Sequence, residues 1–174
     1  MPLTSQVERF MNDIGPPDAV YLQAAWTYLE SRNPRAAQRE LDKVAAWLRT
    51  HPDVLEVRWA IEAHAQHWRT CLEIAQAILD AAPARASGWI KRSFVLHRLH
   101  RTSEALNQLF PAAEKFSDIA VIPYNLACYA ATLDCLWEAE RWLQQSLERG
   151  GAEIRRMALQ DRELEPIWDK IGQL

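Results

Sequence analysis

Two histidine pairs in the chain have a spacing that suits metal binding. His64 and His67, and likewise His97 and His100, are three residues apart, so each pair lies on one side of a helix. Zinc accepts imidazole nitrogens at about 2.0–2.1 Å. No carboxylate or thiol completes a recognised ligand spacing with either pair, and a histidine near the carboxyl end of a helix is already favoured by the helix dipole. We therefore predict no bound metal and no cofactor.

Motifs of common catalytic sites are absent from the sequence. It contains no His-Glu-x-x-His pattern, no glycine-rich phosphate loop and no Gly-x-Ser-x-Gly turn. Scattered Ser, His and Asp residues do not define a site. We predict that the protein is not an enzyme.

A basic segment at 86–101 is a candidate for binding carboxylates. It contains no acidic residue, and its cations are Lys91, Arg92, Arg98 and Arg101. Guanidinium and ammonium groups hold carboxylates through charge-assisted hydrogen bonds, so an acidic peptide or a terminal carboxylate could bind there. The alternative, which we prefer, is pairing with acidic residues of the preceding segment, namely Asp53, Glu56 and Glu62.

Composition limits the kind of protein. The length of 174 residues suits one domain, and the net charge of -3 with a pI near 6.0 offers no general attraction to nucleic acid. No apolar run approaches the ~20 residues of a membrane span, and the amino terminus lacks a secretion signal. Three cysteines without a metal-ligand spacing are typical of reduced thiols. We predict a cytoplasmic protein with no nucleic-acid or membrane partner.

The sequence repeats with a period of 34 residues over 18–51, 52–85, 86–119 and 120–153. One column of this alignment is small in all four segments: Ala37, Cys71, Ala105 and Ala139. Another, four residues later, is apolar: Leu41, Ala75, Leu109 and Leu143. Small side chains at fixed positions let two antiparallel helices approach to 8–10 Å. The period therefore predicts four helix pairs, and Asn33-Pro34 is the break within the first pair.

The pattern resembles the tetratricopeptide repeat (TPR) family. Trp89 stands at the family's tryptophan position, Tyr21 replaces it in the first repeat, Tyr28 is at the tyrosine position and Pro83 is at the closing proline. The resemblance covers residues 18–153. It implies an all-α fold, a right-handed α-α superhelix (solenoid) of about four TPR helix pairs, whose function is to bind other proteins.

Two places depart from the family pattern. In the second repeat, Arg58, Trp59 and Glu62 stand where an apolar, a small and an aromatic residue are expected, so its first helix is either shifted by a residue or packed loosely around the indole. In the third repeat, Pro111 falls inside the expected second helix. We expect a bend near residues 109–110.

Helices are also expected to cover both ends of the stack. The spacing of apolar residues predicts an N-terminal helix over about 3–14, and after Gly150-Gly151 a C-terminal cap over 154–174, in which Asp161 caps a short segment. With these ends, residues 1–174 form a single solenoid domain. Four tryptophans on second helices are expected to seal contacts between repeats: Trp47, Trp68, Trp137 and Trp142.

The first helix of each repeat is predicted to present a partner-binding face in a concave groove. Residues next to the packing stripe should point into this groove, because successive helical residues are rotated by about 100°. The predicted partner-binding residues are Leu22, Gln23, Trp26, Leu29, Glu56, Ile90, Lys91, Phe94, Arg98, Tyr124, Asn125 and Cys128. Alternatively, the aromatic rings belong to the core, or the ends of the chain fill the groove.

The sequence thus predicts a non-catalytic protein–protein interaction module, an adaptor or scaffold that binds a peptide or helix of an unidentified protein. Buried aromatic side chains usually dominate such interfaces, and Trp26, Phe94 and Tyr124 are the candidates. Two alternatives are a self-assembling structural protein, for example a homodimer, and a chaperone for a secreted or assembling substrate.

Overall fold

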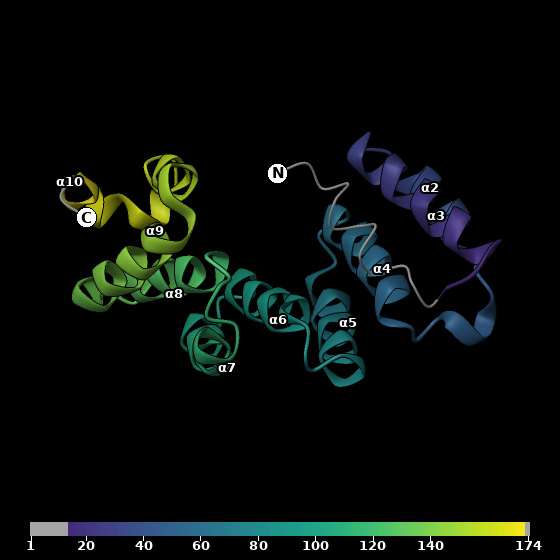
Figure 1. Ribbon diagram of the computed structural model, residues 1–174, viewed down its shortest axis with the longest axis horizontal. Helices are drawn as coiled ribbons and strands as arrows, with labels where there is room; N and C mark the ends of the chain where they lie inside the picture. Colours follow the sequence, from purple (N-terminus) through teal and green to yellow (C-terminus); the bar gives the residue numbers. More distant parts are fainter. Residues whose placement is uncertain (1–13, 173–174) are drawn as a thin grey trace. The chain divides into compact units, whose positions relative to one another are not determined.

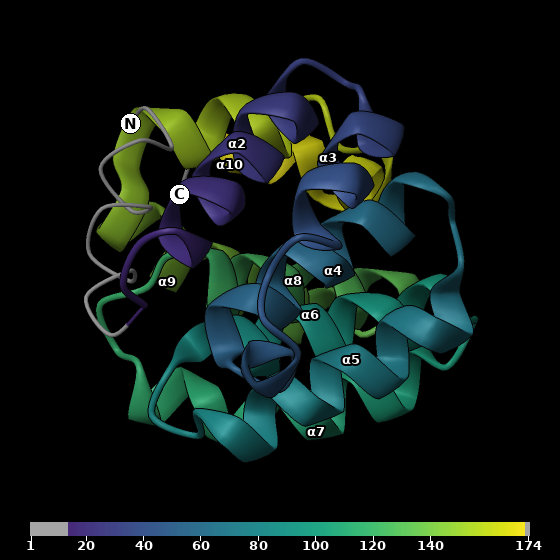
Figure 2. The ribbon, with the colours of Figure 1, turned by 90° about the vertical axis from the view of Figure 1, so that its right-hand side faces the viewer.

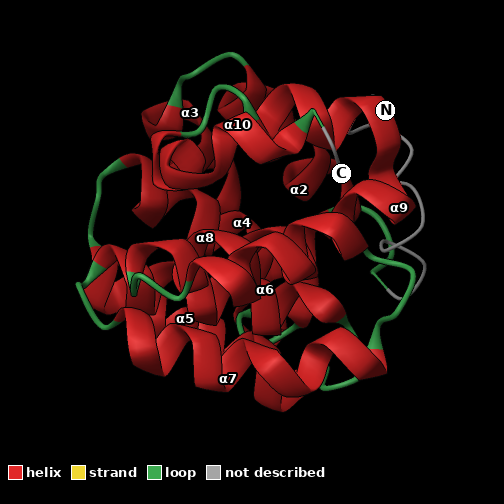
Figure 3. Ribbon diagram, turned by 90° about the vertical axis from the view of Figure 1, so that its left-hand side faces the viewer, coloured by secondary structure: helices red, strands yellow, loops and turns green. Residues whose placement is uncertain are grey.

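A computed structural model describes residues 14–172 of the chain. Every regular element in this range is helical, which confirms the all-α prediction (Figure 3). The helix expected at 3–14 lies outside the described residues except for Ile14, which is buried. None of the described helices is long and apolar enough to cross a bilayer.

The chain divides into two compact units, which are described separately below: unit 1 is Met1–Gly88 and unit 2 is Trp89–Leu174. Unit 1 contains α2 (Asp18–Glu30), α3 (Pro34–Leu41), the short 3-10 helix η1 (Ala46–Leu48), α4 (Pro52–His64) and α5 (Trp68–Ala81). The boundary falls in the first turn of α6 (Ala86–Arg98). Unit 2 continues with α7 (Thr102–Lys115), α8 (Val121–Thr132), α9 (Leu136–Ala158), the 3-10 helix η2 (Arg162–Ile167) and α10 (Trp168–Ile171).

The backbone repeats the period of the sequence. The turn inside each helix pair contains one residue with positive φ, and these residues are 34 positions apart: Arg32, Gln66, His100 and Asp134. The second helices begin at Pro34, Trp68, Thr102 and Leu136, again 34 residues apart. The second repeat is therefore not shifted. Trp59 is half-buried and packs against a cluster of Leu55, Ile74 and Ile78, which accommodates the unusual residue at that position.

The core of unit 1 forms where α2, α3 and α4 meet, and Figure 2 shows α4 and α5 side by side. Ala37 is fully buried, as expected of the small column that allows close helix approach. Asn33 caps α3, because its Oδ1 accepts the Ala36 amide at 3.1 Å. The helix ends at Leu41, three residues before the buried Val44. After this end, the Ala45 amide donates a hydrogen bond of 2.8 Å to the Asp18 carboxylate, so this backbone group has a partner outside a helix.

Gly88, the last residue of unit 1, lies very close to the backbone of α5. A Cβ atom at this position would be 2.8 Å from both N and Cα of Leu79. Backbone atoms cannot move aside as a flexible side chain can. A glycine is therefore required at this close approach.

In unit 2, α8 is the central helix and packs against both α7 and α9 (Figure 1). Most of its side chains are buried, and the Ser146 hydroxyl of α9 donates to the Ala120 carbonyl at 2.8 Å. Pro123 lies in the first turn of α8. Pro111 lies inside α7, which does not end there but continues to Lys115.

Two adjacent glycines, Gly150 and Gly151, lie inside α9. Gly151 has non-helical angles (φ 53°, ψ -132°), so α9 consists of two helical stretches joined at a kink. A Cβ atom on Gly150 would overlap Cγ1 of Ile154. After the second stretch, Asp161 caps η2 by accepting the Glu163 amide at 3.0 Å. This agrees with the cap predicted from the sequence.

The prediction that four tryptophans seal the repeats is wrong for two of them. Trp47 and Trp137 are 77% and 66% exposed, and Arg141 lies 4.8 Å from the centre of the Trp137 ring. Trp142 is half-buried and meets Phe110 edge-to-face, with 5.8 Å between ring centres. Trp47 and Trp137 are therefore surface residues within their units.

Candidate binding recess in unit 2

A recess of about 220 Å³ lies between α6, α8 and the start of η2. Its lining residues are Phe94, His97, Arg98, Tyr124, Asn125, Cys128, Tyr129, Asp161 and Glu163. The α6 residues follow the spacing i, i+3, i+4, so they share one face of that helix. Cys128 stands 34 residues after Phe94, so the two occupy the same repeat position on adjacent first helices. The repeat itself therefore builds two walls of the recess.

Asp161 joins η2 to the floor of the recess. While its Oδ1 caps η2, its Oδ2 accepts the Tyr124 hydroxyl at 2.8 Å and the Cys128 thiol at 3.6 Å. A second hollow of about 350 Å³ is also lined by Tyr124 and Asp161.

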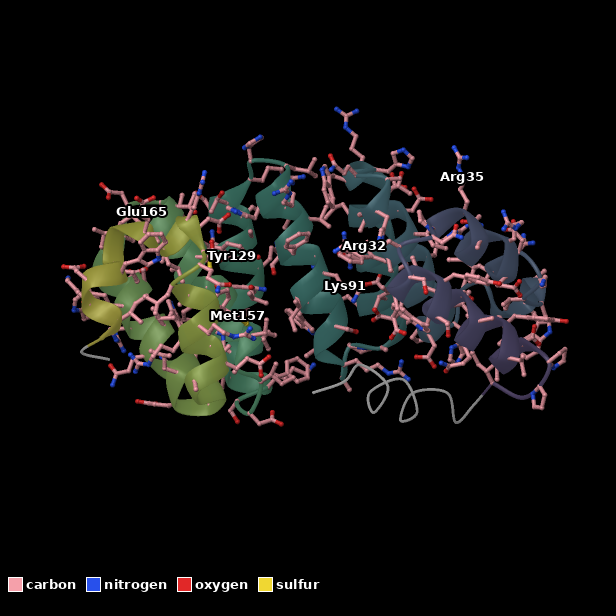
Figure 4. The ribbon with its side chains drawn as sticks, turned by 90° about the horizontal axis from the view of Figure 1, so that it is seen from above. Arg32, Arg35, Lys91, Tyr129, Met157 and Glu165 are labelled. Atoms are coloured by element: carbon pink, nitrogen blue, oxygen red, sulfur yellow. The ribbon has the colours of Figure 1, made fainter. Side chains whose placement is uncertain are left out.

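His97 forms the other link between the helices and the C-terminal segment. Its Nε2 is 2.8 Å from Oε1 of Glu163, and its Nδ1 is 3.0 Å from the Thr102 hydroxyl. The ring also lies 5.0 Å from the Tyr129 ring, whose hydroxyl donates to Ser93 at 3.3 Å. Figure 4 labels Tyr129 in this unit. The imidazole is thus held on both nitrogens.

Burial and nearby negative charge keep the Tyr124 hydroxyl and the Cys128 thiol protonated. Burial raises the pKa of the Tyr124 hydroxyl well above its usual value, and the Cys128 and Asp161 groups beside it act in the same direction. Burial also raises the pKa of the Cys128 thiol, helped by the Asp161 and Glu163 carboxylates. Both groups therefore act as neutral hydrogen-bond donors to Asp161.

Five of the predicted partner-binding residues line this recess: Phe94, Arg98, Tyr124, Asn125 and Cys128. Phe94 is 37% exposed, whereas Tyr124 and Cys128 are buried beneath the C-terminal segment. Phe94, Arg98 and Asn125 therefore make up what we call the rim. Ile90 and Lys91 are half-buried on the preceding turn of α6.

In unit 1 the predicted residues differ in exposure. Leu22 and Leu29 are buried in the core and are not exposed to a partner, which contradicts their place among the predicted partner-binding residues. Trp26 is partly buried and packs against the same core. Gln23 is exposed and Glu56 is half-buried. Asp53 forms an ion pair with Arg85 at 2.6 Å. Arg85 is not one of the four basic residues of segment 86–101 that were predicted to pair with it.

Sequence reasoning misses the contribution of Asp161 and Glu163 to the recess. The sequence indicates only a capping role for Asp161, and nothing in it singles out Glu163. These two residues contact side chains 33 to 66 positions earlier in the chain. No short spacing in the sequence reports such contacts.

Solved structures similar to this chain include TPR proteins. The chain matches TTC0263, a thermophilic TPR protein of Thermus thermophilus, with a TM-score of 0.67 and 16% identity over 98% of this chain and 89% of that one. It matches YrrB, described as a TPR protein with an unusual peptide-binding site, with a TM-score of 0.64 and 14% identity over 99% and 92%. It also matches MamA from Desulfovibrio magneticus RS-1, with a TM-score of 0.68 and 15% identity over 92% and 96%.

At these identities the likeness shows the fold. The chain has the TPR-type helical fold that the 34-residue period predicts. No protein-family model and no curated protein sequence matches it.

Proposed function

We propose that the chain is a non-catalytic interaction module that binds a segment of another protein at the rim of the unit 2 recess. The observation that carries the proposal is the convergence of Phe94, Arg98 and Asn125 around one hollow. The Phe94 ring offers apolar surface, the Asn125 amide can both donate to and accept from a peptide backbone, and the Arg98 guanidinium can bind a carboxylate.

These groups favour a partner segment with an apolar side chain next to an acidic one. The hollow of about 220 Å³ is small, so it accommodates a side chain rather than a whole helix. The peptide-binding site named for the structurally similar YrrB supports a peptide ligand. Gln23, Trp26 and Glu56 of unit 1 are secondary candidates for contact.

The experiment is affinity capture from an extract of the native cells, followed by quantitative binding of the captured partner. Phe94→Ala should weaken binding at least tenfold, because a ring that is 37% exposed at the rim can contact a partner. The unfolding midpoint of the variant is measured as well, so that a loss of fold is not counted as a loss of binding. Phe110→Ala is the matched control, since Phe110 is also exposed but does not line the recess. Equal affinity of the Phe94 variant and the wild type would contradict the proposal.

Self-association is a second candidate function, and the exposed aromatic side chains of unit 2 favour it. Trp137 of α9 and Phe110 of α7 are 66% and 55% exposed. Exposed aromatic surface is characteristic of protein interfaces. Light scattering over a concentration series should then show a mass that increases with concentration in the wild type and less in Trp137→Ala. A constant monomer mass in the wild type would exclude this function.

A further inference from the structure

Three side chains with metal-binding atoms lie close together on the floor of the recess, and His97 lies next to one of them. The Cys128 thiol and the Asp161 and Glu163 carboxylates each have a ligand atom within 4.8 Å of the other two. The His97 Nε2 atom is 2.8 Å from Glu163 Oε1. Thiolate, imidazole and carboxylate are the ligand types that zinc accepts.

Two of the distances between these atoms can be compared with those of a tetrahedral zinc site. Zinc bonds of about 2.0–2.3 Å arranged tetrahedrally place neighbouring ligand atoms about 3.3–3.6 Å apart. Cys128 Sγ and Asp161 Oδ2 are already 3.6 Å apart. The His97–Glu163 pair, at 2.8 Å, needs to separate by about half an ångström for tetrahedral coordination.

Neighbouring residues form hydrogen bonds with these side chains, as residues around the ligands of known metal sites do. A metal-binding histidine usually donates its other ring N–H to an oxygen, which directs the free nitrogen at the metal. The Thr102 hydroxyl lies 3.0 Å from His97 Nδ1 and can accept that hydrogen bond. Asp161 is oriented in the same way by the Glu163 amide and the Tyr124 hydroxyl.

Charge on the floor also favours a cation. The three groups that donate to Asp161 are a phenol, a thiol and a backbone amide, which are all neutral. The Glu163 side chain is 40% exposed, so it can turn toward an ion without losing a buried position. Arg98 lines the same recess and opposes cation binding, so the thiolate is needed to balance the charge.

We propose that unit 2 binds one zinc ion, or a transition metal of similar preference, through Cys128, His97, Asp161 and Glu163. Binding converts the Cys128 thiol to a thiolate and releases its proton to solvent, while His97 binds as the neutral imidazole. The ion connects α6 and α8 to the start of η2, so it fixes the C-terminal segment against these two helices. This site requires no partner protein, so its failure would leave the proposed function untouched.

The test is titration of the metal-free, full-length chain with Co²⁺, which reports a bound thiolate by a charge-transfer absorption band. We expect one equivalent of Co²⁺ to produce the band and one equivalent of Zn²⁺ to abolish it. Cys128→Ser should lose the band. The matched controls Cys71→Ser and Cys135→Ser should keep it, because Cys71 lies in unit 1 and Cys135 is exposed and does not line the recess.

Two further variants keep the proposal testable if Cys128→Ser fails to fold. Glu163→Gln alters a half-exposed side chain and should weaken Zn²⁺ binding at least tenfold. Thr102→Val removes the hydroxyl that can accept a hydrogen bond from His97 Nδ1, and it should weaken Zn²⁺ binding by about 10–100-fold. The proposal is overturned if the folded wild type gives no charge-transfer band, if the band depends on Cys135, or if both variants bind Zn²⁺ as tightly as the wild type.

Discussion

The Tyr124 hydroxyl donates to Asp161 Oδ2 at 2.8 Å and connects α8 to a segment 37 residues later in the chain. The same carboxylate caps η2 through its other oxygen. One side chain therefore both begins the terminal 3-10 helix and attaches it to the repeat array.

Tyr124→Phe should lower the free energy of unfolding by about 1.5–3 kcal/mol. The substitution removes a donor to a charged acceptor and leaves a partly buried carboxylate oxygen with a weaker set of partners. Chemical denaturation measures the change. Tyr28→Phe is the control, because the Tyr28 side chain is 39% exposed, and it should have little effect. Equal stability of the two variants would show that the contact adds nothing.

Gly88→Ala should destabilise the protein by about 1–3 kcal/mol, the usual range for overpacking. The added methyl group would lie 2.8 Å from the Leu79 backbone, and one of the two segments must move. Gly172→Ala is the control, since nothing lies within 4 Å of a Cβ there. Thermal unfolding of the two variants should differ by several degrees, and equal midpoints would contradict the close approach.

Gln66→Gly should stabilise the protein by about 0.5–1 kcal/mol. Gln66 has a φ of 58°, a backbone conformation that costs an L-residue about 1–2 kcal/mol. Glycine avoids this cost, but part of the gain is lost because glycine has more conformational entropy in the unfolded chain. Glu73→Gly, on an exposed position in the interior of α5, should instead destabilise by about 1 kcal/mol. Urea titration gives both values. Destabilisation by Gln66→Gly would show that the side chain contributes more than its backbone strain.

Cysteine alkylation should be confined to Cys135 in the native protein. Burial raises the pKa of Cys71 to about 11, helped by the charge of Glu62, and the thiolate is the reactive form. Below that pH the thiol is therefore mostly protonated, and its reaction should accelerate only as the pH approaches 11. Cys135 is exposed and should be labelled first. Mass spectrometry after labelling at mildly alkaline pH checks this, and in denaturant all three cysteines should react.

The helix pairs can be predicted from the sequence because their register depends on local spacing. Small residues such as Ala37 and Ala105 recur every 34 positions and are fully buried, and the second helices begin at the same interval. The roles of Pro34 and Asp161 at helix starts are predictable for the same reason, because capping acts within a few positions.

The floor of the recess could not be predicted, because it depends on tertiary packing of distant segments. His97 meets Glu163 across 66 positions, and no periodicity relates the C-terminal segment to the repeats. The exposure of Trp47 has a similar origin: α3 ends at Leu41, so the indole does not lie on a continuous second helix. Neither the packing of the recess floor nor the end of α3 at Leu41 follows from helix propensity or residue spacing.

The paired glycines near the end of the fourth repeat determine the direction of the chain that follows them. With any other residue at Gly150 or Gly151, steric overlap with Ile154 or an unfavourable φ would oppose the observed change of direction. A sequence that continued α9 as one straight rod would carry Asp161 away from Tyr124. Homologues that lack the two glycines should therefore also lack the acidic residues at 161 and 163, because these side chains could not contact Tyr124, Cys128 and His97.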